Sequence, residues 1–160
     1  MIFEFNEQQK MLQKMVREFA EQEIAPGVME RDEKEEFSRE LLDKAGDLGL
    51  TGICFPEAYG GSDGDYISYI IASEEIARVD DCVATGFSAS VSLCAFPIYN
   101  YGTEAQKQKY LMPLATGQKL GQPIWFYLFV FPLAVQLSFN TVLAGGKSKN
   151  VGFMISLVYH

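Results

Sequence analysis

The side chains that most enzymes use for proton transfer and metal binding are scarce in this sequence. The single histidine, His160, is the last residue, so there is no internal histidine for a Ser–His–Asp triad, a Cys–His pair, an HExxH zinc motif or a histidine-ligated haem. The dinucleotide pattern GxGxxG and the phosphate-binding pattern GxxxxGK[ST] are also absent. The sequence therefore argues against these catalytic and nucleotide-binding classes, and it predicts no metal site.

Net charge and cysteine content further limit the kind of protein and the compartment that the sequence fits. The 160 residues carry a formal net charge of −8, whereas a phosphate-binding surface needs clustered lysine and arginine, so we expect no unaided binding of nucleic acid. Cys54, Cys82 and Cys94 form no CxxC pair, and such a scattered set favours buried thiols in a reducing compartment. The first ten residues are rich in acidic and amide side chains, unlike a secretory leader. We therefore expect a cytoplasmic protein.

One predicted helix, residues 82–99, is rich in small side chains, a pattern for which close packing of helices is the favoured explanation from the residues alone. Its small residues are Ala84, Gly86, Ser88, Ala89, Ser90, Ser92 and Ala95. Small residues let a neighbour approach closely, and that neighbour is either a ligand or another packed helix. Asp80 or Asp81 is the expected N-cap, and Pro97 is expected to bend the helix near its end.

Hydrophobic periodicity and capping residues place this helix among six in an all-α, up-and-down helical domain. The predicted helices cover residues 6–24, 28–34, 38–48, 66–79, 82–99 and 103–114. Asn6 with Gln9 and Thr103 with Gln106 each fit a capping box, and Ser38 is the expected N-cap of the third helix. The almost continuous apolar run at residues 66–72 predicts a fourth helix that is buried on most sides.

The loop between the third and fourth helices is expected to organise the domain. Gly49 stands where the end of a helix favours a left-handed residue, Pro56 cannot continue a helix, and Gly60–Gly61 is a strong turn signal. Between Gly49 and Pro56 we expect a short extended piece.

Five short motifs in this part of the chain resemble those of the acyl-CoA dehydrogenase family. They are GLTG at 49–52, PEAYGG at 56–61, SEEIA at 73–77, SVSLCA at 90–95 and GTEAQK at 102–107. The resemblance covers residues 3–121 and is closest to the bacterial short-chain, butyryl-CoA type, chiefly through SVSLCA. It implies the helical N-terminal domain of an enzyme that also has a β-domain and a C-terminal four-helix bundle.

The resemblance also implies a chemistry. Members of the family are FAD flavoproteins and homo-oligomers that oxidise an acyl-CoA at its α and β carbons. A glutamate takes the α proton, the flavin takes the β hydride, and the electrons pass to an electron-transfer flavoprotein. No residue here matches that catalytic glutamate, because no glutamate follows Glu104, and no residue is assigned to the FAD.

Two sets of residues acquire a possible role from the resemblance. Ala84, Thr85 and Ser88 would border the acyl pocket of the substrate. Leu48 and Leu50 would form an apolar dock for the electron-transfer flavoprotein. Ordinary core or surface positions explain each of these residues at least as well.

The composition changes abruptly near Gly121, where the family resemblance also stops. Residues 1–120 hold all 21 acids and 11 of the 13 bases, whereas residues 121–160 hold only Lys147 and Lys149. We therefore predict a helical domain at 1–121 and an apolar tail of unknown structure at 122–160. The interpretation we favour is a lost reading frame after Gly121; the alternatives are a membrane-anchored or partner-binding module and a divergent β-region.

The expected function follows from this division. The chain would be a fragment of an FAD-dependent acyl-CoA dehydrogenase, inactive alone because the β-domain and the glutamate base are missing. A helical binding module or a membrane-anchored protein that reuses the domain is the alternative. Residues 123–139 are almost wholly apolar, but their length of 17 residues and Pro132 weaken the case for a membrane span.

Overall fold

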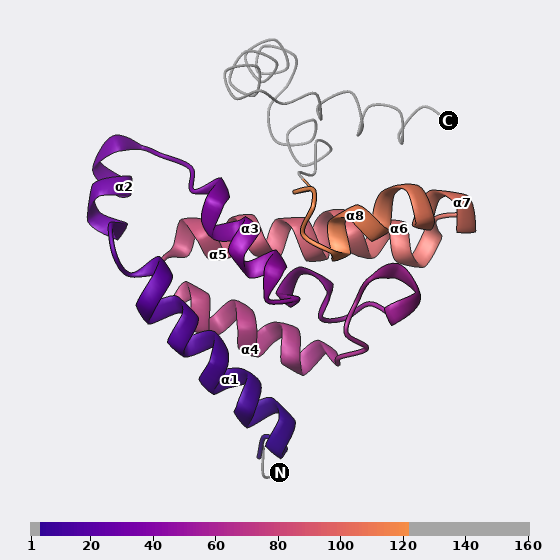
Figure 1. Ribbon diagram of the computed structural model, residues 1–160, viewed down its shortest axis with the longest axis horizontal. Helices are drawn as coiled ribbons and strands as arrows, with labels where there is room; N and C mark the ends of the chain where they lie inside the picture. The colour runs from indigo at the N-terminus through magenta and orange to yellow at the C-terminus, as the bar shows by residue number, and fades with distance from the viewer. Residues whose placement is uncertain (1–3, 122–160) are drawn as a thin grey trace. The chain divides into compact units, whose positions relative to one another are not determined.

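The computed structural model of this protein describes residues 4–121, and residues 1–3 and 122–160 lie outside the described part. The chain divides into two compact units, Met1–Gly121 and Gln122–His160, and the first is described below by itself. The predictions made for the tail fall on residues outside this description. Within 4–121 every regular element is helical, which confirms the predicted fold class (Figure 1). Helical segments that follow one another without a break form six continuous helices, which are called rods below.

Three of the six rods are single helices, and three combine α-helical with π-helical segments. The single helices are α2 (Val28–Lys34), α3 (Arg39–Asp47) and α4 (Tyr66–Ala77). The first rod consists of α1 (Glu7–Phe19) and a π-helical turn (Ala20–Ile24). The fifth consists of α5 (Asp81–Ser88), a π-helical segment (Ala89–Ala95) and α6 (Phe96–Tyr101). The sixth consists of α7 (Glu104–Gln106), a π-helical turn (Lys107–Leu111) and α8 (Met112–Ala115). The segment Ala89–Ala95 is called the π-segment below, and Pro97, where the sequence predicts a bend, lies in the first turn of α6.

Local capping explains where most of the helices begin. Asn6 and Thr103 each form the predicted capping box with the residue three positions later. Asp80, rather than Asp81, caps α5 by accepting a hydrogen bond from the Val83 amide. Ser38 occupies the N-cap position of α3, but its side chain makes no capping hydrogen bond.

The loop between α3 and α4 is folded more tightly than its sequence suggests. Gly49 adopts the expected left-handed conformation, with φ of 76°, and Gly60, in the expected turn, is also left-handed, with φ of 79°. The extended piece expected before Pro56 is wrong, because Leu50–Gly52 is a 3₁₀ turn and the Phe55 amide donates to the Gly52 carbonyl. This curled backbone satisfies its own polar groups in the interior of the domain, which an isolated extended segment would not.

The core lies on both sides of α4, which packs against α1 and against α5, and it extends into the loop before α4 (Figure 1). Its largest fully buried side chains include Ile24 from the first rod, Phe55 and Leu50 from the loop, Ile76 from α4 and Phe87 from α5. Each such side chain contributes about 1.5–3 kcal/mol through removal of apolar surface from water. The loop is therefore part of the hydrophobic core, and it holds the sixth rod through a hydrogen bond from Thr51 Oγ1 to the Ala115 carbonyl.

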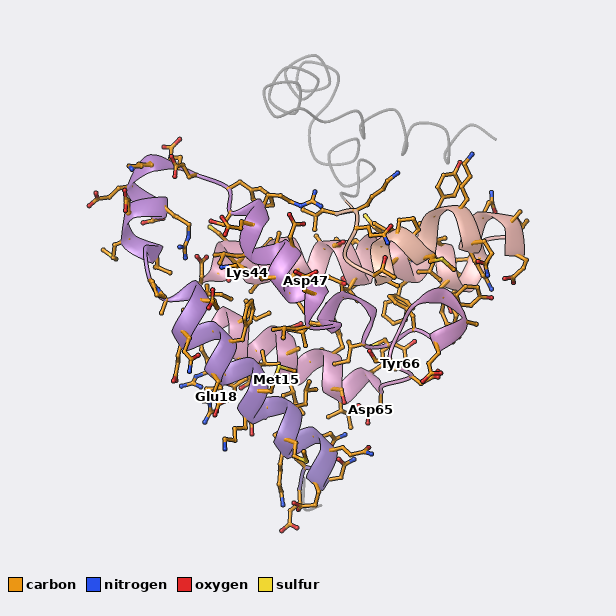
Figure 2. All side chains as sticks on the ribbon, viewed as in Figure 1. Met15, Glu18, Lys44, Asp47, Asp65 and Tyr66 are labelled. Atoms are coloured by element: carbon orange, nitrogen blue, oxygen red, sulfur yellow. The ribbon has the colours of Figure 1, made fainter. Side chains whose placement is uncertain are left out.

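Helix α4 is less buried than its apolar sequence predicts. Tyr66, Ile67 and Ile70 are 60%, 50% and 56% exposed in the described unit. Figure 2 places Tyr66 at the start of this helix, beside its N-cap Asp65. The prediction of burial on most sides is wrong for residues 4–121, because α1 and α5 pack against other sides of α4 and leave this face uncovered.

A buried ion cluster ties α4 to α1. The Glu75 carboxylate is 2% exposed and accepts hydrogen bonds from Arg17 Nε and Nη2 at 2.9 and 2.7 Å. Arg78 Nη1 and Gln13 Nε2 donate to the same carboxylate at 2.7 and 2.9 Å. Hydrogen bonding from Arg17 is the largest cause that lowers the pKa of Glu75, to about 2, so the carboxylate is ionised at neutral pH.

A third arginine, Arg31, connects three elements: α2, the first rod and α5. Arg31 on α2 donates to the Ile24 and Pro26 carbonyls at the end of the first rod, at 2.6 and 2.8 Å. Its Nη2 also lies 3.0 Å from a carboxylate oxygen of Asp80, the N-cap of α5. One guanidinium therefore satisfies the last carbonyls of one rod and positions the first turn of another.

Within the described residues, one helical stretch, Asp81–Tyr101, is long and apolar enough to cross a membrane. Half of that window is buried against the rest of the unit, as in the core helix of a globular domain.

Candidate functional site

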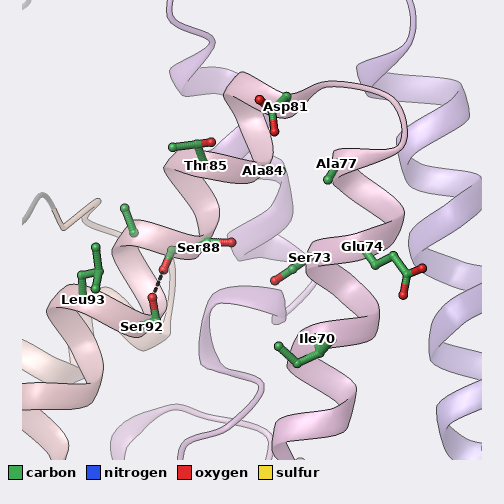
Figure 3. A pocket seen from close by; sticks show the side chains of 11 residues that line it. Ile70, Ser73, Glu74, Ala77, Asp81, Ala84, Thr85, Ser88, Ser92 and Leu93 are labelled. Carbon is green, nitrogen blue, oxygen red and sulfur yellow. Dashed lines mark hydrogen bonds between the residues drawn. The ribbon is translucent and has the colours of Figure 1, made fainter.

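A hollow of about 600 Å³ lies between α4 and the fifth rod (Figure 3). From α4 it is lined by Ile70, Ser73, Glu74 and Ala77. The opposite wall is formed by α5 and the π-segment. The hollow is open to solvent on one side, adjoining the uncovered face of α4.

The opposite wall brings together the three residues that the family resemblance singled out. Ala84, Thr85 and Ser88 all line the hollow, as do Ser92 and Leu93 farther along the rod. Their short side chains do not reach across to α4, which is the physical reason why a hollow exists between two otherwise packed helices.

Two serine hydroxyls on these walls are paired within their own helices. Ser92 Oγ donates to the Ser88 carbonyl at 2.6 Å, which Figure 3 marks with a dashed line. On the other wall, Ser73 Oγ donates to the Tyr69 carbonyl at 3.0 Å. Because these hydroxyls are engaged with backbone carbonyls, the walls offer a mostly apolar lining and suit a hydrocarbon group.

Charge at the hollow is negative. Glu74 and Asp81 line it, and no lysine or arginine of the described residues does. Such a lining disfavours phosphate groups and favours an uncharged ligand portion. The pyrophosphate of FAD needs N–H donors or basic side chains, so the lining of this hollow does not fit that part of FAD, and no reaction step is derived through the cofactor. Residues 4–121 also contain no cluster of three or more His, Cys, Asp or Glu side chains that could hold a metal ion.

The two leucines expected to dock a partner are placed very differently. Leu48, at the end of α3, is 44% exposed and accessible to another protein. Leu50 is 1% exposed and belongs to the core, so the docking role expected for it is wrong. The 3₁₀ turn that begins at Leu50 directs its side chain inward, and only Leu48 remains a candidate contact.

The three cysteines are free, and burial makes two of them, Cys54 and Cys94, poor nucleophiles. Burial raises the pKa of Cys94 to about 12, and burial together with the nearby Asp65 raises that of Cys54 to about 11. Cys82 is exposed, contrary to the expectation that the thiols are buried. Neither Cys54 nor Cys82 lines the hollow.

Sequence reasoning missed the α4 wall of the site. Ile70, Ser73 and Ala77 recur at spacings of three and four and so share one face of the helix. The continuous apolar run at 66–72 obscured this pattern because it resembles a helix buried all round. The small side chains of Ser73 and Ala77 at that spacing were the signal available in the sequence.

Comparison with known proteins identifies the family. Residues 6–118 match the family described as "Acyl-CoA dehydrogenase, N-terminal domain". Butyryl-CoA dehydrogenase from Megasphaera elsdenii is similar in structure, with a TM-score of 0.72 and 48% identity over 76% of this chain. The chain belongs to the acyl-CoA dehydrogenase family and corresponds to its N-terminal helical domain.

Two further solved structures are similar. A chain in the study of the electron transferring flavoprotein of Acidaminococcus fermentans and flavin-based electron bifurcation matches with a TM-score of 0.74 and 53% identity, over 76% of this chain and 32% of that chain. The acyl-CoA dehydrogenase of Bacillus anthracis, solved with FAD, matches with a TM-score of 0.68 and 39% identity, over 73% of this chain and 20% of that chain. The chain spans about a third of the length of the M. elsdenii relative, 32%.

Proposed function

We propose that this chain is the N-terminal part of an FAD-dependent acyl-CoA dehydrogenase and that its hollow holds the acyl chain of a short-chain substrate such as butyryl-CoA. One observation carries the proposal: Ala84, Thr85 and Ser88 together form one wall of a mostly apolar hollow. A short hydrocarbon chain fits such a surface.

The residues of this chain have a binding role in the proposal. Ile70 and Leu93 exclude water from the acyl group, while the small side chains of α5 leave room for it. Glu74 and Asp81 repel phosphates, so the nucleotide part of coenzyme A is expected to lie away from them.

The proton and electron transfers require groups outside residues 4–121. When bound, the flavin supplies hydride acceptance, and a glutamate absent from this chain supplies the base. The purified 160-residue protein is therefore expected to be colourless and to show no butyryl-CoA dehydrogenase activity. A yellow preparation with a flavin absorption spectrum would contradict this expectation.

Partner binding is proposed on the α3 side of the domain. An electron-transfer flavoprotein would contact the exposed Leu48, in a cytoplasmic, homo-oligomeric enzyme of the full family length. Leu48→Glu should then reduce capture of an electron-transfer flavoprotein in a pull-down, whereas Gln108→Glu, on the exposed surface of the sixth rod, should not.

A chimera tests the substrate assignment directly. Residues 1–121 would replace the corresponding part of the M. elsdenii butyryl-CoA dehydrogenase, and activity with butyryl-CoA would be measured. In this chimera, Ser88→Phe fills the hollow and should raise KM for butyryl-CoA by about tenfold or more. Asp32→Phe on the exposed α2 is the control and should leave KM unchanged. An active chimera in which Ser88→Phe leaves KM unaltered would refute the assignment.

The alternatives depend on residues 122–160. Reading the DNA in all three frames beyond the Gly121 codon distinguishes them. A second frame that continues the family sequence supports a lost reading frame. If the other frames are closed, a binding module or a membrane-anchored protein becomes the better proposal, and recovery in salt-washed membranes would identify the latter.

A further inference from the structure

We propose that Ser90 is a positioning residue whose hydroxyl fixes the backbone at Gly121, where the helical unit ends. Through Ser90, Gly121 is connected to the π-segment, which forms part of the wall of the hollow. The proposal concerns Gly121, the last described residue, and is independent of the ligand assigned to the hollow.

Ser90 lies in the π-segment on the side away from the hollow. Its side chain is buried, and Ser90 Oγ accepts a hydrogen bond from the Gly121 amide at 3.0 Å. Two residues later, Ser92 lines the hollow and bonds only within its own helix, to the Ser88 carbonyl. The π-segment thus presents one serine to the hollow and another to the end of the unit.

The backbone at Gly121 is packed directly against the same segment. A Cβ atom at Gly121 would lie 2.5 Å from Cys94 Cβ and 3.0 Å from Cys94 Sγ. Leu114 Cδ2 would lie at 3.3 Å on the other side. Only glycine permits this approach, so the hydrogen bond to Ser90 and the absence of a side chain act together to set the position of Gly121.

The preceding residues bring Gly121 to this place by a defined path. After α8, the Gly117 amide donates to the Leu114 carbonyl, with φ of 73° at Gly117, and the Lys119 amide donates to the Pro113 carbonyl. The segment therefore folds back along α8, and the Gly121 amide would be a buried donor without Ser90 Oγ.

Amide hydrogen exchange in the full 160-residue chain tests the proposal. Ser90→Ala removes the acceptor and should accelerate exchange of the Gly121 amide roughly tenfold, while amides in α1 and α4 are unchanged. Ser90→Thr keeps a hydroxyl and should restore slow exchange. Ser92→Ala, which removes a serine hydroxyl from the same segment, is the matched control and should leave Gly121 unaffected.

Ser90→Val provides a second comparison, because valine and threonine have nearly the same shape and differ in the hydroxyl. Exchange of the Gly121 amide should be roughly tenfold faster with valine than with threonine. Equal exchange rates in this pair, or equal acceleration by Ser90→Ala and Ser92→Ala, would overturn the proposal. The comparison of Ser90→Val with Ser90→Thr still tests the proposal if Ser90→Ala unfolds the domain by leaving a cavity.

Discussion

Helix α4 has two contrasting sides. Toward the core, Ile76 is fully buried and Glu75 is held by two arginines and a glutamine. Toward the hollow, Ile70 remains more than half exposed and Ala77 faces the small residues of α5. The comparison shows that the size of the opposing side chains decides whether one apolar helix forms a packed interface or one wall of a binding site.

The largest expected difference between the two sides is in apolar packing. Ile76→Ala should lower the free energy of unfolding by about 4 kcal/mol, because it leaves a cavity in a filled core. The same change at Ile70 should cost less than about 1 kcal/mol, because that side chain is already largely in water. Urea denaturation measures both, and similar losses would show that the hollow side is packed after all.

The ion cluster gives the next largest contrast, between two adjacent glutamates. Glu75→Gln should destabilise the domain by about 3 kcal/mol, because it leaves buried hydrogen-bonding groups poorly matched. Glu74→Gln, on the exposed hollow side, should change stability by less than about 0.5 kcal/mol. If the two variants have equal urea midpoints, the cluster does not stabilise the α1–α4 interface.

The same cluster should also make the stability of the domain depend on pH in the acid range. The pKa of Glu75 is lowered from 4.5 to about 2, so its contribution is present above pH 4.5 and is lost as the pH falls toward 2. The loss should be roughly 2 kcal/mol, since both arginines are about half exposed and partly screened. Thermal unfolding from pH 6 to pH 2 should therefore show a weaker pH dependence in Glu75→Gln than in the wild type, and parallel curves would contradict the assignment.

The smallest effect is expected where a side chain grows into open space. Thr85→Leu extends into the hollow and should change the unfolding free energy by less than about 0.5 kcal/mol. Ala72→Leu, at a fully buried position of α4, should cost about 1–3 kcal/mol through overpacking. Equal costs, measured as urea midpoints, would mean that the hollow cannot accept added volume.

Elements controlled by neighbouring residues were predictable from the sequence. The capping boxes at Asn6 and Thr103, the left-handed Gly49 and the turn at Gly60 involve groups within a few residues of one another. The six helices follow from periodicity over one or two turns. Ala84, Thr85 and Ser88 were singled out by the family resemblance rather than by periodicity, and the structure places them together on one wall of the hollow.

Features that depend on distant partners were not predictable. The burial of Leu50 follows from a tight turn inside the core, and the exposure of Ile67 and Ile70 follows from which sides of α4 its neighbours occupy. Periodicity reports how apolar a helix is, but not which neighbours cover it.

The sequence by itself determined the helices, the capping boxes at Asn6 and Thr103 and the left-handed Gly49, because short-range sterics and hydrogen bonds control them. Only the tertiary structure decided three other features. A hollow lies between α4 and α5, Glu75 accepts hydrogen bonds from Arg17 and Arg78, and Ser90 accepts one from the Gly121 amide. Each of these joins residues brought together by packing of the whole domain, where the volume and polarity of many side chains act at once.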